Sequence, residues 1–355
     1  MKINLENKKL FQKYDPDQAL ISIKRLARQC RQAQKETKEL KLPRLSQKIE
    51  NIIVCGMGGS ALGSDIIRTA LRDYLKVPFH IINDYHLPAF VNRRSLGLVI
   101  SYSGSTEETT AAGQAAVRKG LPVIIITSGG KLAQLLKSHH LPGYLFKPWH
   151  NPSGQPRLGL GYSLVSQIQI LRRLNLLDLS ENKLEEALKF LEKSTKKFEE
   201  TVKDNPAKEI ANELFGRIPV VFSSLYTSGN AHAFTNQIHE NAKNFACYFT
   251  LPELNHHLLE GITHPAAINY FTYLLLESSL DSPAIKNRFS VTKKVLEKKR
   301  FKTIIIKVLG PDWLSQAFWT LSFGSFVSFY LALLNQENPA SIPWVNFFKK
   351  ELAKK

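Results

Sequence analysis

The chain contains little cysteine, and its cysteines form neither a metal-binding pattern nor a disulfide pattern. Cys30, Cys55 and Cys247 are odd in number, widely spaced and never arranged as C-x-x-C. This argues against a structural zinc site and a disulfide framework, and it is typical of proteins in a reducing cytosol. The first ten residues, MKINLENKKL, also lack the apolar region of a secretory signal. We therefore expect a cytoplasmic protein that holds no metal.

Long uncharged stretches are scarce as well, and one of them is long enough to cross a bilayer. Residues 313–334 contain no Asp, Glu, Lys or Arg. Six polar side chains are nevertheless spread through this stretch, namely Ser315, Gln316, Thr320, Ser322, Ser325 and Ser328. We expect a buried core helix of a soluble domain here, and no membrane partner.

Acidic residues are in short supply relative to basic ones. The 48 Lys and Arg outnumber the 30 Asp and Glu, which gives a net charge of +18. Much of the excess lies in residues 1–50 and 286–307. Such charge attracts anionic ligands or nucleic acid. No zinc-finger, homeodomain or basic-zipper pattern accompanies it, and Phe289 and Phe301 are too few aromatics for a base-stacking platform. A solvated basic surface is the preferred interpretation, and nucleic-acid binding is not expected.

The length and composition are those of a globular protein with about two domains. After a helical N-terminal segment, short apolar runs rich in β-branched residues alternate with helical patterns. Their continuous apolarity predicts strands covered on both faces, and the alternation predicts a parallel sheet. The first series of runs comprises residues 51–56, 78–84, 96–104, 121–129 and 144–148, with helical patterns at 61–75, 106–119 and 131–139.

The strand and helix alternation stops at a charged helical stretch and then starts again. Further strands are predicted at 218–224, 246–252 and 301–310, and further helices near 228–243 and at 313–334. The predicted fold class is therefore α/β, with two doubly wound, mainly parallel sheets flanked by helices. The predicted division is a helical segment at 1–45, a first domain at 46–179, a helical connector at 180–205 and a second domain at 206–355.

A glycine-rich loop, GMGGSALGS (56–64), follows the first predicted strand and opens a helix. In parallel sheets, ligands bind beyond the carboxyl ends of strands, where the amides of helix N-termini point outward. Gly58 and Gly59 allow close approach of an anion, and Ser60 can donate a hydroxyl. The loop matches neither G-x-G-x-x-G nor G-x-x-x-x-G-K-[ST], which argues against dinucleotides and Mg-nucleotides. Taken alone, it is equally compatible with a plain strand–helix turn.

The segment SYSGSTEET (101–109) follows the next long apolar run. Ser101, Ser103 and Thr106 supply hydroxyls, whereas two glutamates look unsuited to a phosphate. A helix that begins near Ser105 or Thr106 would put those glutamates in its first turn, where acids are favoured. Their side chains would then point away while amides and hydroxyls face the ligand. Two such loops in one half of the chain predict a phosphate site built from neutral donors.

These motifs, taken together, resemble a known family. GMGGSALGSDI, DYHLPAFV, SYSGSTEET, TSGGKLAQL and QPRLGLGY occur in the order seen in bifunctional phosphoglucose/phosphomannose isomerases of the sugar isomerase (SIS) superfamily. HENAK, LPELNHH and FKKEL extend the resemblance over nearly the whole chain. It implies two SIS domains and aldose–ketose isomerisation of glucose 6-phosphate, with mannose 6-phosphate also accepted. It also implies a homodimer with shared active sites and no cofactor.

The resemblance carries roles onto particular residues. Glu240 is similar in position to the base that moves a proton between C1 and C2, and Arg157 to the arginine that stabilises the enediolate. His256 resembles the ring-opening histidine, which in this family crosses the dimer interface. Lys349 resembles the lysine that assists ring opening, although the adjacent Lys350 leaves the register open. The resemblance assigns binding of the substrate phosphate to Gly58, Gly59, Ser60, Ser101, Ser103 and Thr106.

The sequence departs from the family pattern at four positions. Ala233 and Thr235 stand where Arg and Lys are common, His257 where Asn is usual, and Leu258 where an acid is usual. These changes put the groups that support Glu240 and His256 in doubt, and geometric errors of about 1 Å cost roughly a hundredfold in rate. The acid and base groups themselves are present, so we predict activity with an altered rate or sugar preference. The alternative is a non-catalytic SIS protein that binds sugar phosphates as a regulator.

Overall fold

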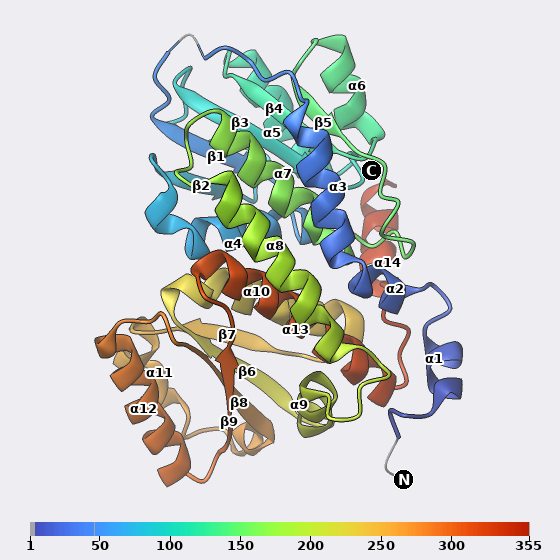
Figure 1. The fold of residues 1–355 in the computed structure, drawn as a ribbon, viewed down its shortest axis with the longest axis vertical. Coiled ribbons are helices and arrows are strands. Elements are labelled where there is room, and N and C mark those ends of the chain that lie inside the picture. The colour runs from blue at the N-terminus through green and yellow to red at the C-terminus, as the bar shows by residue number, and fades with distance from the viewer. Residues whose placement is uncertain (1–3, 46, 355) are drawn as a thin grey trace.

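The protein is described by a computed structural model that covers residues 4–45 and 47–354. Two parallel sheets lie one above the other in Figure 1, each accompanied by helices. The N-terminal helices are α1 (Lys8–Tyr14), α2 (Ala19–Lys24) and α3 (Leu26–Lys38). The Asp15 carboxylate starts α2 by accepting from the amides of Ala19 (2.6 Å) and Leu20 (3.0 Å). α3 packs against the first half of the molecule.

The first sheet has the strand order β2-β1-β3-β4-β5, and all of its pairs are parallel. Its strands are β1 (Asn51–Cys55), β2 (Phe79–Ile82), β3 (Ser95–Ser101), β4 (Val123–Thr127) and β5 (Gly143–Leu145). β3 and β4 are buried along their whole length, which explains their unbroken apolar sequences. The accompanying helices are α4 (Gly59–Ala70), η1 (Arg72–Tyr74), α5 (Glu107–Arg118), α6 (Gly130–Ser138), η2 (Pro156–Leu158) and α7 (Leu160–Arg173).

The helix in the predicted connector (180–205) is shorter than that stretch, and it is packed into the core. α8 (Glu181–Thr195) ends eight residues before Lys203 and is followed by the turn η3 (Lys196–Phe198). Leu184, Leu188 and Leu191 are fully buried, because the apolar stripe of α8 packs against α3 and against a helix of the second half. The helix therefore forms part of the core between the two halves.

The second sheet has the order β7-β6-β8-β9 and is again entirely parallel. Its strands are β6 (Ile218–Ser223), β7 (Cys247–Thr250), β8 (Phe271–Ser278) and β9 (Lys302–Val308). Its helices are α9 (Pro206–Leu214), η4 (Leu225–Thr227), α10 (Ser228–Ala242), η5 (Glu253–His256), α11 (Leu258–Gly261), η6 (Ala266–Tyr270), α12 (Pro283–Lys298), α13 (Trp313–Leu334) and α14 (Pro343–Leu352). The predicted α/β class with two parallel sheets is confirmed, although the patterns do not predict β8.

α13 is the long uncharged helix noted in the sequence. It is long and apolar enough to cross a membrane, but every residue of its most apolar stretch is buried inside the structure. Asp312 caps it by accepting from the amide of Ser315 at 2.9 Å. The prediction of a buried core helix is therefore confirmed. α13 packs on α10, and α10 in turn packs on α4, so these helices join the two halves.

Candidate active site

The glycine-rich loop joins the end of β1 to the start of α4. Gly58 has φ +48°, a conformation that favours glycine. At Gly59 a Cβ atom would lie 2.9 Å from the backbone nitrogen of Arg157, so a larger residue would push that segment away. Gly58 therefore permits the turn of the loop, and Gly59 allows it to lie in direct contact with the Pro156–Arg157 backbone. Two segments that the sequence separates by about 100 residues meet here.

The second loop, after β3, lies beside the first because β1 and β3 are neighbouring strands. The backbone amide of Tyr102 donates to Oγ of Ser60 at 2.9 Å, which ties the two loops together. Oγ of Ser101 lies 3.0 Å from Oγ1 of Thr106 and also accepts from the amide of Gly104. Ser103 is exposed at the edge of the loop. The predicted phosphate-binding hydroxyls therefore occupy adjacent loops at one edge of the sheet.

The position of the two glutamates in this loop agrees with the expected geometry. Thr106 is the N-cap of α5, and Glu107 and Glu108 form its first turn. Gly104 has φ +70°, and a Cβ atom there would overlap with the carbonyl oxygen of Gly129. Only glycine fits this turn, which holds the loop at the N-terminal end of α5. Acidic side chains stabilise that end of a helix, and its amides suit an anion.

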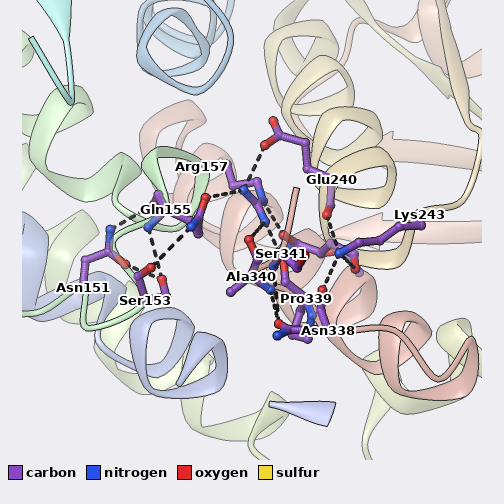
Figure 2. A network of polar contacts seen from close by, with 12 residues as sticks. Asn151, Ser153, Gln155, Arg157, Glu240, Lys243, Asn338, Pro339, Ala340 and Ser341 are labelled. Carbon is purple, nitrogen blue, oxygen red and sulfur yellow. Dashed lines mark hydrogen bonds and ion pairs between the residues drawn. The ribbon is translucent and has the colours of Figure 1, made fainter. Parts of the chain in front are cut away.

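Arg157 is the central residue of the site and is almost completely buried, at 1% exposure. Its Nη1 donates to Oε2 of Glu240 at 2.9 Å and to Oε1 of Gln155 at 3.1 Å, while its Nε donates to Oδ1 of Asn241 at 2.6 Å (Figure 2). Burial lowers the pKa of Arg157 and the neighbouring Glu240 opposes that shift. A guanidinium remains protonated even so. The site therefore places a fixed positive charge directly beside a carboxylate.

The remaining donors of Arg157 bind the loop between α13 and α14. Its Nη2 donates to the carbonyl oxygens of Pro339 at 2.6 Å and Ala340 at 3.1 Å. Lys243 binds the same loop through the carbonyl oxygen of Asn338, and it also donates to the carbonyl oxygens of Glu240 (3.0 Å) and Asn241. Figure 2 shows these contacts converging from three separate parts of the chain. The loop thus fixes Arg157 and the end of α10 relative to each other.

Lys243 makes the stability of the folded chain depend on pH. Burial, followed by the charge of Arg157, lowers the pKa of Lys243 from its ordinary value of 10.5 to about 8. The unfolded chain therefore binds more protons than the folded chain between about pH 8 and 10.5, so Lys243 makes stability rise with pH in that window.

Replacing Lys243 with methionine should remove this rise. We expect the melting temperature of the wild type, relative to Lys243→Met, to increase from pH 8 to pH 10 and to stay constant below pH 8. Lys137→Met, at an exposed position of α6, is the control and should show no such trend. A wild-type advantage over Lys243→Met that does not change between pH 7 and pH 10 would contradict the assignment.

Glu240 combines a fixed position with access to a ligand. It lies near the end of α10, and its side chain is 29% exposed although its partner Arg157 is buried. One carboxylate oxygen binds the guanidinium, and that ion pair orients the group. A carboxylate held in this way is suited to remove and return a proton, and the guanidinium is suited to stabilise an oxyanion.

The two predicted ring-opening residues lie apart from this pair. His256 is exposed at the end of η5, beyond β7, and Lys349 is exposed on α14, as is Lys350. Within residues 4–45 and 47–354, no hydrogen bond or ion pair joins His256 or Lys349 to Arg157 or Glu240. α14 nevertheless begins three residues after Ala340, so Lys349 extends from the loop that Arg157 binds. The contacts of the described residues bring together Arg157, Glu240 and the glycine-rich loop, and no hydrogen bond or ion pair among them includes His256 or Lys349.

Comparison with known proteins agrees with this arrangement. The model of the bacterial phospho-glucose isomerase C-terminal SIS domain matches residues 203–352. A bifunctional phosphoglucose/phosphomannose isomerase of Aquifex aeolicus is 35% identical over 307 residues, which cover 86% of this chain and 91% of the relative. The chain belongs to the bifunctional phosphoglucose/phosphomannose isomerase family. A member from Caldicellulosiruptor bescii is 31% identical and covers 94% of this chain and 98% of its own length.

A solved structure supports the fold independently. A hypothetical protein from Thermus thermophilus superposes with a TM-score of 0.77 at 15% identity, covering 98% of this chain and 93% of the other. At that identity the likeness concerns the fold alone. The family assignment made from the sequence motifs is confirmed by the closer relatives.

The structure shows where the four positions that depart from the family pattern lie. Ala233 and Thr235 are buried on α10, and Oγ1 of Thr235 donates back to the carbonyl oxygen of His232 at 3.0 Å. The ion pair of Arg157 with Glu240 forms without a basic residue at either position. His257 contacts Glu253 at 2.9 Å, and Leu258 packs at the edge of a core cluster. Both lie in the segment that carries His256, away from Glu240.

Sequence reasoning did not identify the main-chain acceptors of Arg157. Pro339 and Ala340 act through backbone carbonyls, which every residue type has, so their identities carry no signal. Gln155 belongs to the motif QPRLGLGY and Asn241 to HENAK, close in sequence to Arg157 and Glu240. This closeness is the signal in the sequence that points to them.

Proposed function

We propose that this protein interconverts glucose 6-phosphate, and also mannose 6-phosphate, with fructose 6-phosphate. The observation that carries the proposal is the ion pair of Arg157 and Glu240 beside two hydroxyl-rich loops at strand ends. The names of the Aquifex and Caldicellulosiruptor relatives supply the substrates. A phosphosugar held by the loops through its phosphate extends from them toward Glu240.

The geometry suggests a proton-transfer mechanism. Glu240 removes the proton from C2 of the open-chain aldose, and the electrons of that C–H bond form the C1–C2 double bond while the π electrons of the C1 carbonyl move to O1, which gives a cis-enediolate. A proton moves from the hydroxyl at C2 to O1, and the electrons left on O2 form the carbonyl at C2. The C1–C2 π electrons take the proton back from the carboxylic acid at C1, which gives the ketose. The guanidinium of Arg157 stabilises negative charge on the enediolate oxygens. A positioned base contributes about 10²–10⁴ in rate, and a preorganised charge adds a further large factor.

Ring opening requires an acid and base near the ring oxygen and O1 of the sugar. We assign this step to His256 and Lys349 as the family resemblance implies. Because His256 is exposed and lies away from Glu240 in its own chain, it would reach the site of the partner subunit in a homodimer. Each active site then uses Glu240 of one subunit and His256 of the other.

Subunit sharing makes a specific prediction. A hybrid dimer of a Glu240→Gln chain and a His256→Ala chain would contain one site with both groups intact and one site with neither. After subunit exchange, a mixture of the two variants should recover about one quarter of wild-type activity, because half of the randomly paired dimers are hybrids. Activity no greater than the sum of the two separate variants would contradict a shared site.

The function itself is tested by incubating EDTA-treated protein with fructose 6-phosphate and identifying the products by NMR. The proposal predicts both glucose 6-phosphate and mannose 6-phosphate. Binding of fructose 6-phosphate, seen as thermal stabilisation, without product even at stoichiometric protein would overturn it. That outcome would favour the alternative of a non-catalytic sugar-phosphate-binding regulator.

A further inference from the structure

A groove of about 730 Å³ extends from the candidate active site along the junction of the two halves. One wall is formed by α4, α10 and β7, and the other by β2 and the loop that follows it. It reaches the site at Gly58, which lines the groove together with Asn236 of α10. Asn236 precedes Glu240 by four residues, so the two side chains lie on the same face of the helix, about 6 Å apart along its axis.

The polar wall of the groove depends on close packing of α4 against α10. At Gly229 a Cβ atom would overlap with the carbonyl oxygen of Asp65, so the helices approach closely there. This contact places His232 beside Asp65, with Nδ1 of His232 2.8 Å from Oδ2 of Asp65. The other carboxylate oxygen of Asp65 accepts from Arg68, and Asp65 is 7% exposed. The carboxylate is therefore buried between two nitrogen partners from different halves.

The charges of this wall balance. Burial alone would raise the pKa of Asp65, but the hydrogen bond with His232 and the charge of Arg68 bring that pKa below its usual value. The negative charge of Asp65 and the positive charge of Arg68 cancel, so the wall offers no surplus positive charge for a second phosphate. Across the groove lie Phe90 and His80, whose rings are 4.9 Å apart. A neutral polyhydroxy ligand with one apolar face, such as the carbon chain of a sugar, suits these surroundings.

His232 connects Asp65 to Asn236. In the tautomer that donates its Nδ1–H to the Asp65 carboxylate, His232 presents Nε2 as an acceptor. Nδ2 of Asn236 lies 3.3 Å from this Nε2. The ring of His232 is also held by stacking on Tyr248, at 5.3 Å between centroids. The chain from Asp65 through His232 therefore turns the amide nitrogen of Asn236 toward the histidine and leaves its Oδ1 for a ligand.

We propose that Asn236 binds a sugar hydroxyl next to the reacting carbons and thereby sets the preference between the two aldose substrates, with His232 and Asp65 as its positioning residues. The inference rests on the proposed function, because it concerns the same site. Glu240 acts at C1 and C2, and glucose 6-phosphate and mannose 6-phosphate differ only in configuration at C2. An acceptor held one helical turn from the base interacts differently with the two sugars.

The test measures kcat and KM separately for both aldoses in Asn236→Ala, His232→Ala and the double variant. One hydrogen bond to an uncharged group contributes about 0.5–1.5 kcal/mol, so Asn236→Ala should change the ratio of the two kcat/KM values by about 2- to 10-fold. His232→Ala should shift the ratio in the same direction by less. The double variant should match Asn236→Ala, because His232 acts through Asn236. Asn287→Ala, at an exposed position of α12, is the matched control and should leave the ratio unchanged.

Three results would overturn the inference. The first is an equal loss of kcat/KM for both sugars in Asn236→Ala. The second is a double variant whose change in the ratio is the sum of the two single changes. The third is a change in dimer dissociation without a change in the ratio, which would mean that the partner subunit fills the groove. If the wild type turns over neither aldose, the proposed function fails instead. The same variants are then compared by calorimetric Kd for glucose 6-phosphate and mannose 6-phosphate, and an unchanged Kd ratio in Asn236→Ala would overturn the inference independently.

Discussion

Glu240→Gln is expected to lower kcat for isomerisation by about 10²–10⁴-fold, the contribution of a positioned general base. Glutamine keeps the shape of the side chain, and its amide oxygen can still accept from Nη1 of Arg157, which lies 2.9 Å from the carboxylate in the wild type. The melting temperature and the affinity for fructose 6-phosphate should therefore stay close to wild type. The loss should appear in kcat and not in KM, which steady-state kinetics with both aldoses would establish.

The matched control for this variant is Glu186→Gln, an exposed position of α8. It removes the same charge from a surface helix and should leave kcat unchanged. A Glu240→Gln enzyme that retained more than about a tenth of wild-type kcat would show that another group moves the proton. A large loss of thermal stability in Glu240→Gln would likewise contradict the interpretation, because it would assign the carboxylate a structural role.

Arg157→Met is expected to have the largest effect on stability as well as abolishing activity. Arg157 donates to a carboxylate, two side-chain amides and two backbone carbonyls, and its side chain has no exposure to solvent. Methionine fills similar volume but leaves all of these acceptors without their donor. Each buried acceptor left without its donor costs about 1–3 kcal/mol, which should show as a lower midpoint of urea unfolding.

Two further variants sharpen the Arg157 experiment. Arg157→Lys keeps the charge but has a single ammonium in place of the planar guanidinium, so it should recover part of the stability and little of the activity. Arg94→Met breaks an exposed ion pair with Glu50 and should change the free energy of unfolding by no more than about 1 kcal/mol. An Arg157→Met protein as stable as Arg94→Met would contradict the central role of the buried guanidinium.

Much of the fold follows from local patterns in the sequence. β3 and β4 have continuous apolar sequences because both of their faces are covered, and the alternation with helices predicts parallel pairing. The start of α5 was also predictable, because Glu107 and Glu108 suit the first turn of a helix and Gly104 suits the turn before it. Placing the two hydroxyl-rich loops side by side required only the rule that ligands bind where parallel strands end.

The rest depends on contacts that the local sequence does not encode. Arg157 and Glu240 are 83 residues apart, and their pairing follows from the way α10 meets the loop before α7. Without the family resemblance, the sequence favours a helix-surface glutamate paired with Lys243 at Glu240 and a loop arginine that bridges to an acid or to backbone at Arg157. The role of the Pro339 and Ala340 carbonyls and the Asp65–His232 pair also emerges only when the two halves pack together. Side-chain contacts between distant segments are therefore the part of the site that cannot be predicted from a single sequence.

The role of Glu240 as the base is tested most directly by isomerisation of fructose 6-phosphate in D₂O, with Glu240→Gln run beside the wild type. The proposed mechanism predicts glucose 6-phosphate and mannose 6-phosphate that carry deuterium at C2 from the wild type, since the proton on the base exchanges with solvent between the two steps. It predicts almost no product from Glu240→Gln. Equal deuterium incorporation by the two proteins, or no product from wild type that binds the sugar, would contradict it.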